Sequence, residues 1–360
     1  MGVQADIRQA TESYETWLRG CTNVVQSALK SKHEQMRRDP FLFFRGTYYR
    51  WTQVFPEVCK ELAHAPKLLC AGDLHVGSFG TWRDREGRLC WGVDDFDDAY
   101  PLAYTNDLIR LAASVKIVTD AESLTIKYGE GCDAILEGYG QALRDGGCPF
   151  VLAEHEMNLE KLGLEAIKPP RDFWETLKSE PAVPPSAVPR DARAALASGL
   201  PPKMAYRISR RQAGMGSLGQ PRFVALGEHE GGYIAREVKA TVPSASVWSQ
   251  GESGRGEKYY KRAIETAVRS PDPYQNVVKG WIVRRLSPDS NPIEIEDLPK
   301  SRDEATLLHA MGKEVGNVHL GSRSKTKTVL KDLRRRPTKW LRRAGKHMAG
   351  MMEKDWKKYA

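Results

Sequence analysis

The pattern of apolar and polar residues predicts helices that alternate with short strands over the first 150 residues. Residues 4–38 place apolar side chains at helical spacing, and a second helical stretch, 43–65, is interrupted near Pro56. The runs "KLLCA" and "RLCWGV" are short and apolar, which is typical of buried strands. Further helices are predicted over 105–124 and 126–144, and "DGG" stops the second of them.

The composition changes after residue 168. Eight of the 21 prolines fall between 169 and 202, and proline removes backbone donors and fixes φ. This stretch therefore predicts a linker or an extended wrapping segment, with one helix at "DARAALASG". Beyond it, "RFVALGEHEGGYIAREVKAT" predicts two strands joined by a tight "EGG" turn, and "NVVKGWIVRRLS" predicts a strand pair or an edge strand. Helices are expected over 257–268 and over a stretch that ends at Gly321.

The overall composition is ordinary for a soluble globular chain. Its 360 residues are enough for two lobes. No apolar run reaches the ~20 residues of a membrane helix, so no transmembrane segment is expected, and the first residues lack a signal-peptide pattern. The six cysteines show no CxxC pair and no metal-ligand spacing. We therefore expect reduced thiols in a cytoplasmic protein.

Positive charge is concentrated at the end of the chain. Residues 323–360 hold 14 Lys and Arg against 3 Asp and Glu, a net charge of +11. Since the whole chain carries +9, the remaining residues carry −2. This basic tail interleaves its charges with Trp340, Trp356 and methionines. It is either a solvated extension or an arm for an anionic partner, which is nucleic acid or a membrane surface, and the sequence does not decide between them.

Two of the apolar strands run directly into carboxylates. "LCAGDLHVGSFG" places Asp73 after the first, and "WGVDDFDDAY" places Asp95 and Asp97 after the second. A buried strand that ends in Asp delivers its carboxylate to the mouth of a cleft. The carboxylates of "DDFDD" repel one another unless a cation neutralises them, and hard oxygen ligands suit Mg²⁺. An acidic solvated turn is the alternative, but the apolar flanks of the motif favour a metal site.

A second glycine-rich segment, "GMGSLG", satisfies G-x-G-x-x-G at Gly214, Gly216 and Gly219. Alone the pattern is weak, and a simple turn is its commoner explanation. Here it precedes the predicted hairpin, whose second strand carries Lys239. Glycine loop, strand, turn, strand and lysine follow in the order of a kinase nucleotide-binding lobe. The segment, with Ser217, is thus predicted to cover phosphates through its backbone N–H groups, and Lys239 to pair with phosphate oxygens.

In such a lobe the lysine takes a carboxylate partner from the next helix. Glu265 and Glu257 are both placed to supply it, and the spacing does not choose between them. We assign Glu265 to the site.

Together the motifs resemble the catalytic core of the aminoglycoside-phosphotransferase branch of the protein-kinase-like superfamily. The segments that carry the resemblance are "GDLHVGSFG", "VDDFDDA" and "NDLIRLAAS". The chain is more similar still to an uncharacterised bacterial group, domain of unknown function family 2252. The blocks "SPF-FRG", "GD-H--NFG", "NDFD" and "DL-RLA-S" of that group are matched by "DPFLFFRG", "GDLHVGSFG", "DDFDD" and "DLIRLAAS". The likeness covers most of residues 36–322 and implies an α+β, two-lobed kinase-like fold that uses ATP and Mg²⁺.

The resemblance also implies roles for individual residues. Asp73 would be the catalytic aspartate that orients or deprotonates an acceptor hydroxyl. Asp95 would be the metal-binding aspartate, with Asp97 as a helper. His75 would brace the catalytic loop, and Asp107 would anchor that loop from the following helix. Such a set is chemically sufficient, because phosphoryl transfer needs mainly positioning and charge neutralisation.

One residue departs from the pattern. The kinase motif has Asn five residues after the catalytic aspartate, as second metal ligand, and this chain has Ser78. A hydroxyl can bind Mg²⁺, but it is a weaker ligand than a carboxamide oxygen. Ser78 therefore leaves open a weakened or altered activity.

The order of the motifs also differs from that of ordinary kinases. There the glycine loop and the lysine come before the catalytic aspartate, whereas here the loop with Asp73 comes first. We therefore expect a circularly permuted kinase-like fold. Its expected parts are a helical, catalytic lobe, a proline-rich linker, a nucleotide-binding β lobe, a helix that returns to the catalytic lobe, and the basic tail; these are residues 1–168, 169–205, 206–290, 291–322 and 323–360. Residues 43–63 compete with the returning helix for the place before the catalytic loop.

The function expected from these features is ATP- and Mg²⁺-dependent phosphoryl transfer to a hydroxyl-bearing substrate. One alternative keeps the fold and changes the chemistry to nucleotidyl transfer or to non-catalytic nucleotide binding. Another is a nucleic-acid- or membrane-binding protein that acts through its basic tail. The sequence names neither the acceptor nor the oligomeric state.

Overall fold

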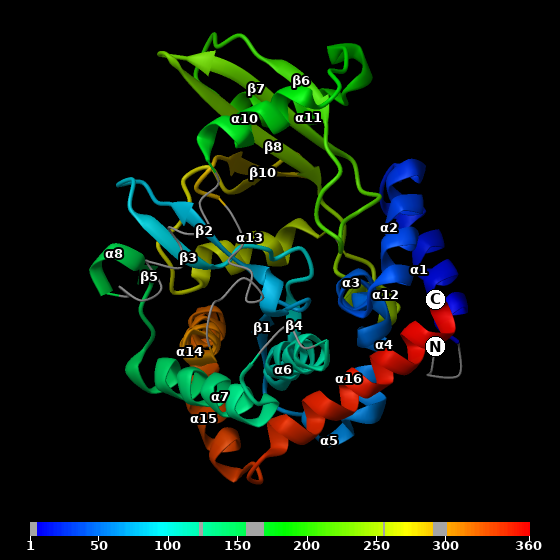
Figure 1. The fold of residues 1–360 in the computed structure, drawn as a ribbon, viewed down its shortest axis with the longest axis vertical. Helices are drawn as coiled ribbons and strands as arrows, with labels where there is room; N and C mark the ends of the chain where they lie inside the picture. Colours follow the sequence, from blue (N-terminus) through cyan, green and yellow to red (C-terminus); the bar gives the residue numbers. More distant parts are fainter. Residues whose placement is uncertain (1–5, 122–124, 156–168, 255, 291–300) are drawn as a thin grey trace.

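The structure is a mixture of helices and antiparallel strands. It is a computed structural model that describes residues 6–121, 125–155, 169–254, 256–290 and 301–360. Within these residues the strands form three antiparallel sheets. Figure 1 shows the largest sheet at one end of the molecule and most of the long helices at the other. The chain is therefore α+β, as expected.

The helices in the described part of the chain are α1 (Ile7–Cys21), α2 (Gln26–Arg38), α3 (Pro40–Gly46), α4 (Tyr48–Val58), α5 (Lys60–Ala63), α6 (Thr105–Asp120), α7 (Tyr128–Asp145), α8 (Leu152–His155), α10 (Pro170–Ser179), α11 (Arg190–Ser198), α12 (Ala245–Ser249), α13 (Glu257–Thr266), α14 (Ser301–His319), α15 (Thr326–Arg335) and α16 (Trp340–Tyr359), with 3₁₀ turns η1 (Val76–Ser78), η2 (Pro185–Ala187) and η4 (Leu320–Lys325). The strands are β1 (Lys67–Cys70), β2 (Phe79–Arg83), β3 (Leu89–Val93), β4 (Tyr100–Ala103), β5 (Phe150–Val151), β6 (Arg207–Arg210), β7 (Arg222–His229), β8 (Gly232–Ala240), β9 (Asn276–Val278) and β10 (Trp281–Leu286).

The largest sheet contains five strands in the order β6–β7–β8–β10–β9. The predicted hairpin is confirmed as β7 and β8, which pair along their whole length. Glu230 and Gly231 form its turn with φ of 50° and 81°, the left-handed conformation that a two-residue hairpin turn requires. The second predicted pair is confirmed as β9 and β10. Both pairs therefore contribute to one sheet.

The proline-rich residues 169–205 cover both faces of this sheet. They fold as two helices and a 3₁₀ turn, of which the sequence predicted only α11. Leu196 of α11 packs with Val238 on one face, while Leu177 of α10 packs with Val224 on the other. Prolines stand at the starts of these helices, where the missing N–H is not needed. Of the two predicted alternatives, a linker or a wrapping segment, the structure shows a segment that wraps the sheet and contributes to its core.

The other end of the molecule is built from long helices around α6, which is buried along most of its length. Helices α7 and α14 pack closely at Gly312 of α14, because glycine has no side chain. A Cβ there would lie 2.1 Å from the carbonyl oxygen of Ile135 in α7. Helix α16 crosses α6 on the opposite side, which Figure 1 shows in red. The first part of the predicted returning segment, residues 291–300, lies outside the described residues.

The basic tail is part of this helical end. The apolar face of α16, which includes Leu341, Met348 and Met352, is fully buried. Asp355 makes a buried ion pair with Arg50 of α4 at 2.7 Å. A free extension is therefore wrong for residues 326–359: apolar residues at helical spacing dock α16 onto α6 and α15 onto α7, and the charged faces of both helices reach solvent.

The two short apolar strands predicted early in the chain are confirmed as β1 and β3. β1 pairs with β4, and β3 lies between β2 and β5. Each ends just before one of the acidic motifs, which fall in the loops that follow Cys70 and Val93. No described helix is long and apolar enough to span a membrane.

Candidate active site

A cavity of about 610 Å³ lies between the five-stranded sheet and the loops that follow β1 and β3. Most of the residues assigned from the sequence meet here, although they are as many as 166 positions apart. Its lining includes Asp73, His75, Ser78, Asp95, Asp97, Gly214, Gly216, Ser217 and Lys239. Asp107, Gly219 and Glu265 are not among the lining residues.

Asp73 stands at one end of the cavity and is held by a buried arginine. Nε of Arg110, on α6, donates to Oδ1 of Asp73 at 2.7 Å. The guanidinium also stacks on Phe44, with Cζ 4.0 Å from the ring centre, and donates to the Phe44 carbonyl oxygen. Burial raises the pKa of Asp73, and the charge of Arg110 partly offsets that rise. Asp73 is thus a fixed carboxylate with a strengthened tendency to take a proton.

Asp107 holds the backbone that leads to Asp73. Its carboxylate accepts the N–H groups of Ala71 and Gly72 at 2.7 and 3.1 Å. Nε2 of His319, from α14, lies 3.2 Å from Asp107, and Nδ1 of His319 lies 2.9 Å from the hydroxyl of Tyr139. Asp107 is completely buried behind the loop. The structure therefore places it as an anchor of the loop, outside the cavity.

His75 and Ser78 shape the same loop. The Ser78 hydroxyl accepts the N–H of His75 at 3.0 Å and donates to the Asp73 carbonyl oxygen at 3.3 Å. The structure thus uses this hydroxyl within the loop, whereas the sequence assigned it to a metal. Burial, with the charges of Arg45 and Arg110, holds the pKa of His75 well below its usual range. His75 is therefore neutral near pH 7.

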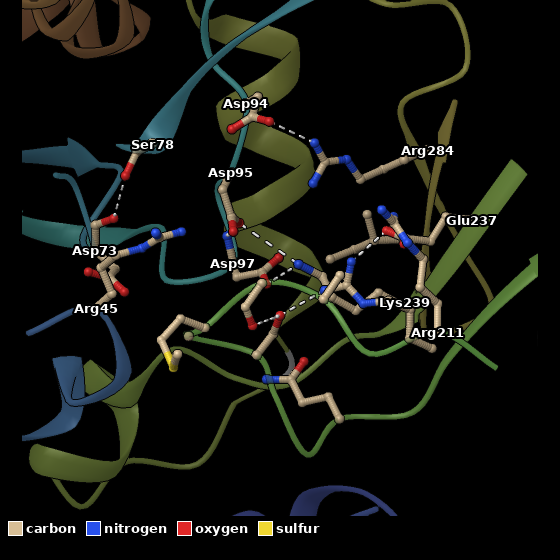
Figure 2. Close-up of a pocket in the computed structure, with 18 of the residues that line it drawn as sticks. Arg45, Asp73, Ser78, Asp94, Asp95, Asp97, Arg211, Glu237, Lys239 and Arg284 are labelled. Atoms are coloured by element: carbon tan, nitrogen blue, oxygen red, sulfur yellow. Dashed lines mark hydrogen bonds and ion pairs between the residues drawn. The ribbon is translucent and has the colours of Figure 1, made fainter. Parts of the chain in front are cut away.

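The acidic loop after β3 faces the sheet through a buried lysine. Nζ of Lys239 forms an ion pair with Asp97 and lies 3.9 Å from Oδ1 of Asp95. Asp94 pairs with Arg284 of β10 at 2.9 Å, and Figure 2 shows these contacts across the cavity. Although burial acts the other way, Lys239 holds the pKa of Asp95 below its usual value. Burial and the neighbouring Asp95 raise the pKa of Asp97 to about 6.

The donor set of this loop fits a hard divalent cation. Oδ1 of Asp97 is buried and has no hydrogen-bond partner. Asp95 and Asp97 offer oxygen ligands next to each other, which is the chemistry that Mg²⁺ prefers. The described residues contain one other group of side chains whose ligand atoms lie close together. It consists of Cys70, Asp107 and His319. That cluster is a satisfied hydrogen-bond network, so the acidic loop is the better candidate.

The glycine-rich segment connects β6 to β7 and reaches the Asp73 end of the cavity. Gly214 and Gly219 have φ of 76° and 103°, which favour glycine, and a Cβ on Gly216 would lie 3.5 Å from Oδ2 of Asp73. Nζ of the buried Lys32, on α2, donates to the Gly216 carbonyl oxygen at 3.0 Å. The Ser217 hydroxyl accepts from Arg222 at 2.8 Å. The segment thus lies opposite the loop that carries Asp73, held from behind by α2.

The carboxylate partner of Lys239 differs from the expected one. Glu265 lies on an exposed part of α13 and pairs with Lys261 at 3.7 Å. Lys239 pairs instead with Asp97, because its side chain projects from the sheet face that looks toward the acidic loop. The assignment of Glu265 is therefore wrong on geometry.

Sequence reasoning also missed a charged cluster on that sheet face. Glu237 is buried and accepts from Arg222 at 2.7 Å and from Arg211 at 2.9 Å. Burial opposes its ionisation, but these arginines lower the pKa of Glu237 to about 2. The signal was present, because Glu237 stands two residues before Lys239 and shares its side of β8.

Part of the chain matches a protein family. A family model described as "Uncharacterized protein conserved in bacteria (DUF2252)" matches residues 24–161. No curated protein and no solved structure matches the chain. The matched range contains both acidic loops and Asp107, whereas the glycine-rich segment and Lys239 lie outside it. The chain is thus similar to this bacterial family over the part that carries the cavity carboxylates.

Proposed function

We propose that the chain is an ATP- and Mg²⁺-dependent phosphotransferase that acts on a hydroxyl group. The observation that carries the proposal is the shared cavity, in which Asp73, the pair Asp95 and Asp97, Lys239 and the glycine-rich segment all face one space. Phosphoryl transfer needs these parts: an oriented acceptor, charge neutralisation and a clamp on the phosphates.

The arrangement of the sheet supports a kinase-like nucleotide lobe. The glycine-rich segment joins its first two strands along the chain, β6 and β7, and Lys239 lies on the third, β8. In protein kinases the phosphate-binding lysine likewise lies on the third strand of the lobe. Because the catalytic loop precedes this sheet in the chain, we propose a two-lobed kinase-like fold in circularly permuted form.

Asp73 is the catalytic base in this proposal. A base must be fixed within reach of the acceptor proton, and its pKa must be close enough to neutral for transfer. Arg110 fixes the carboxylate, Asp107 fixes the backbone that carries it, and burial raises its pKa. Asp73 would orient the acceptor hydroxyl and take its proton.

Asp95 and Asp97 would hold Mg²⁺, which when bound neutralises the charge on the transferred phosphoryl group. Without a ligand, Lys239 neutralises the two carboxylates. When they hold the cation, Lys239 is free to pair with phosphate oxygens, while backbone N–H groups of the glycine-rich segment cover the phosphates. The apolar Ile282, which pairs with Lys239 in the sheet, and Leu286, also on β10, line the cavity and suit an adenine ring.

Nucleotidyl transfer and non-catalytic nucleotide binding are kept as alternatives, because the Ser78 hydroxyl is already used by the loop backbone. A loop that offers one ligand fewer to the metal holds it more weakly. Mass spectrometry of products after incubation with Mg·ATP and fractionated small metabolites separates the three cases. Phosphoryl transfer yields ADP and an acceptor heavier by one phosphate, whereas nucleotidyl transfer yields diphosphate and an adenylated acceptor.

The other alternative is binding of nucleic acid or a membrane surface through the basic tail. The tail still presents positive charge to solvent, but it is folded onto the helices and is not a free arm. Basic side chains of α15 and α16 such as Lys331, Arg335 and Lys346 are exposed, while the apolar residues between them are buried in the fold. RNA or anionic vesicles that bound more tightly than Mg·ATP would favour this alternative.

A further inference from the structure

The Asp73 end of the cavity contains an arginine that the proposed phosphoryl transfer does not use. Arg45, the last basic residue of α3, lines the cavity. No carboxylate of the described residues lies within ion-pair distance of it, and its Nε is buried without a hydrogen-bond partner. The other cavity arginines are different, since Arg211 and Arg222 pair with Glu237, and Arg284 with Asp94.

Asp73 does not need Arg45 as a counter-ion. Arg110 already neutralises Asp73 from behind, through a contact of 2.7 Å, and is itself completely buried. Arg45 therefore adds a positive charge that faces the cavity beside a carboxylate that is already paired. A guanidinium left without an acceptor in a partly buried place is costly unless a ligand supplies one.

A second buried nitrogen without a hydrogen-bond partner lies next to it. His75 is 7% exposed and lines the cavity, and its Nδ1 is buried without a hydrogen-bond partner. Gly77 separates the two side chains. A Cβ on Gly77 would lie 3.5 Å from Nδ1 of His75 and 3.7 Å from Cζ of Arg45. The absence of a side chain at Gly77 thus leaves a recess that both groups border.

We propose that Arg45, His75 and Gly77 form a subsite for an anionic group of the acceptor, a carboxylate or a phosphate. The inference rests on the proposed function, because it places this anion next to the hydroxyl that meets Asp73. Guanidinium groups bind both anions through two parallel hydrogen bonds, and a neutral imidazole with its proton on Nδ1 adds a third donor. The acceptor is then an anionic alcohol, such as a hydroxy acid or a phosphorylated sugar, and not a cationic one.

Inorganic phosphate is the probe that tests the subsite. Isothermal titration of the full chain with phosphate should give one weak site, with a dissociation constant of about 1–10 mM. Arg45→Gln removes the guanidinium and should weaken binding about tenfold or more. Gly77→Ala should do the same, because its methyl group fills the recess at ordinary contact distances and φ is −90°, so the fold tolerates it. Arg45→Lys should weaken binding less than Arg45→Gln.

Arg211→Gln is the matched control, since Arg211 lines the cavity at the sheet and is paired with Glu237. It should leave phosphate affinity within about twofold. The inference is overturned if phosphate fails to bind, if Gly77→Ala and Arg45→Gln bind it as the parent does, or if Arg211→Gln alone abolishes binding. Repeating the titration with a saturating non-hydrolysable Mg·ATP analogue separates the two proposals. If phosphate binds and the nucleotide analogue does not, the subsite is supported and the kinase proposal is contradicted. If the nucleotide analogue binds and phosphate does not, only the subsite is contradicted.

Discussion

The guanidinium of Arg110 lies directly behind the carboxylate of Asp73, with Nε 2.7 Å from Oδ1. Arg110 stands three residues after Asp107 on α6, so one face of one helix holds the loop twice. Asp107 accepts the N–H groups of the loop, and Arg110 donates to the side chain that the loop presents. The two contacts together fix both the position and the direction of Asp73.

This pairing predicts strong coupling between the two residues. Arg110→Met leaves the Asp73 carboxylate without its partner and should lower the free energy of unfolding by about 3–5 kcal/mol. The double variant Asp73→Asn with Arg110→Met should cost clearly less than the two single changes together, because no unpaired charge is left. Urea unfolding of the four proteins measures the coupling. Strict additivity would show that the pair is not a unit.

Asp73→Asn alone separates catalysis from binding. The amide keeps the shape of the side chain but cannot take a proton, so turnover should fall by about 100-fold or more. Affinity for Mg·ATP should change by less than about threefold, since the proposal assigns Asp73 to the acceptor and not to the nucleotide. Asp120→Asn, at the exposed end of α6, is the control and should leave both quantities unchanged. Retained turnover in Asp73→Asn would remove the residue from its assigned role.

Stability should depend on pH through Glu314. Burial raises the pKa of this carboxyl to about 7, although Arg269 opposes the rise. The folded protein therefore binds the proton more tightly than the unfolded chain. The contribution of Glu314 to the free energy of unfolding is thus complete below about pH 4.5 and is lost as pH rises through about 7. Glu314→Gln should flatten the pH dependence of the unfolding free energy in this window, while the exposed Glu130→Gln should not. Equal slopes in Glu314→Gln and the parent would contradict the account.

Two glycines in helices should respond in opposite ways to substitution by alanine, because one lies in a close helix contact and the other faces open space. A Cβ at Gly312 would lie 2.1 Å from a backbone oxygen of α7, so Gly312→Ala should destabilise the fold by about 1–3 kcal/mol or more. Nothing lies within 4 Å of a Cβ at Gly350 in α16, and Gly350→Ala should stabilise it by about 0.5–1 kcal/mol. Thermal unfolding of both variants checks the pair. A stable Gly312→Ala protein would mean that the helices do not approach so closely.

The sequence predicted the elements of this fold better than their assembly. The apolar strands before Asp73 and Asp95 and the hairpin that carries Lys239 could be read from periodicity and turn residues, which act over a few positions. The roles of the proline-rich residues and of the tail could not. Helices α10 and α16 are fixed by contacts with a sheet and a helix far away in the chain, and local composition does not record those contacts.

The same distinction holds in the site. Motifs identified Asp73, Asp95, Asp97, Lys239 and the glycine-rich segment, and the cavity brings them together. Pairings across it were not predictable, because spacing along a strand or helix cannot say which side chain lies opposite. Glu265 was therefore chosen in error for Lys239.

The most direct test of the proposal is calorimetric titration with Mg·ATP of the parent protein and of Lys239→Met. The account predicts one site in the parent that requires Mg²⁺, and an affinity lower by about tenfold or more when Lys239 loses its charge. Far-ultraviolet circular dichroism of Lys239→Met verifies that it is folded. A folded parent that binds no Mg·ATP, or a folded Lys239→Met that binds it as tightly as the parent, would contradict the nucleotide site.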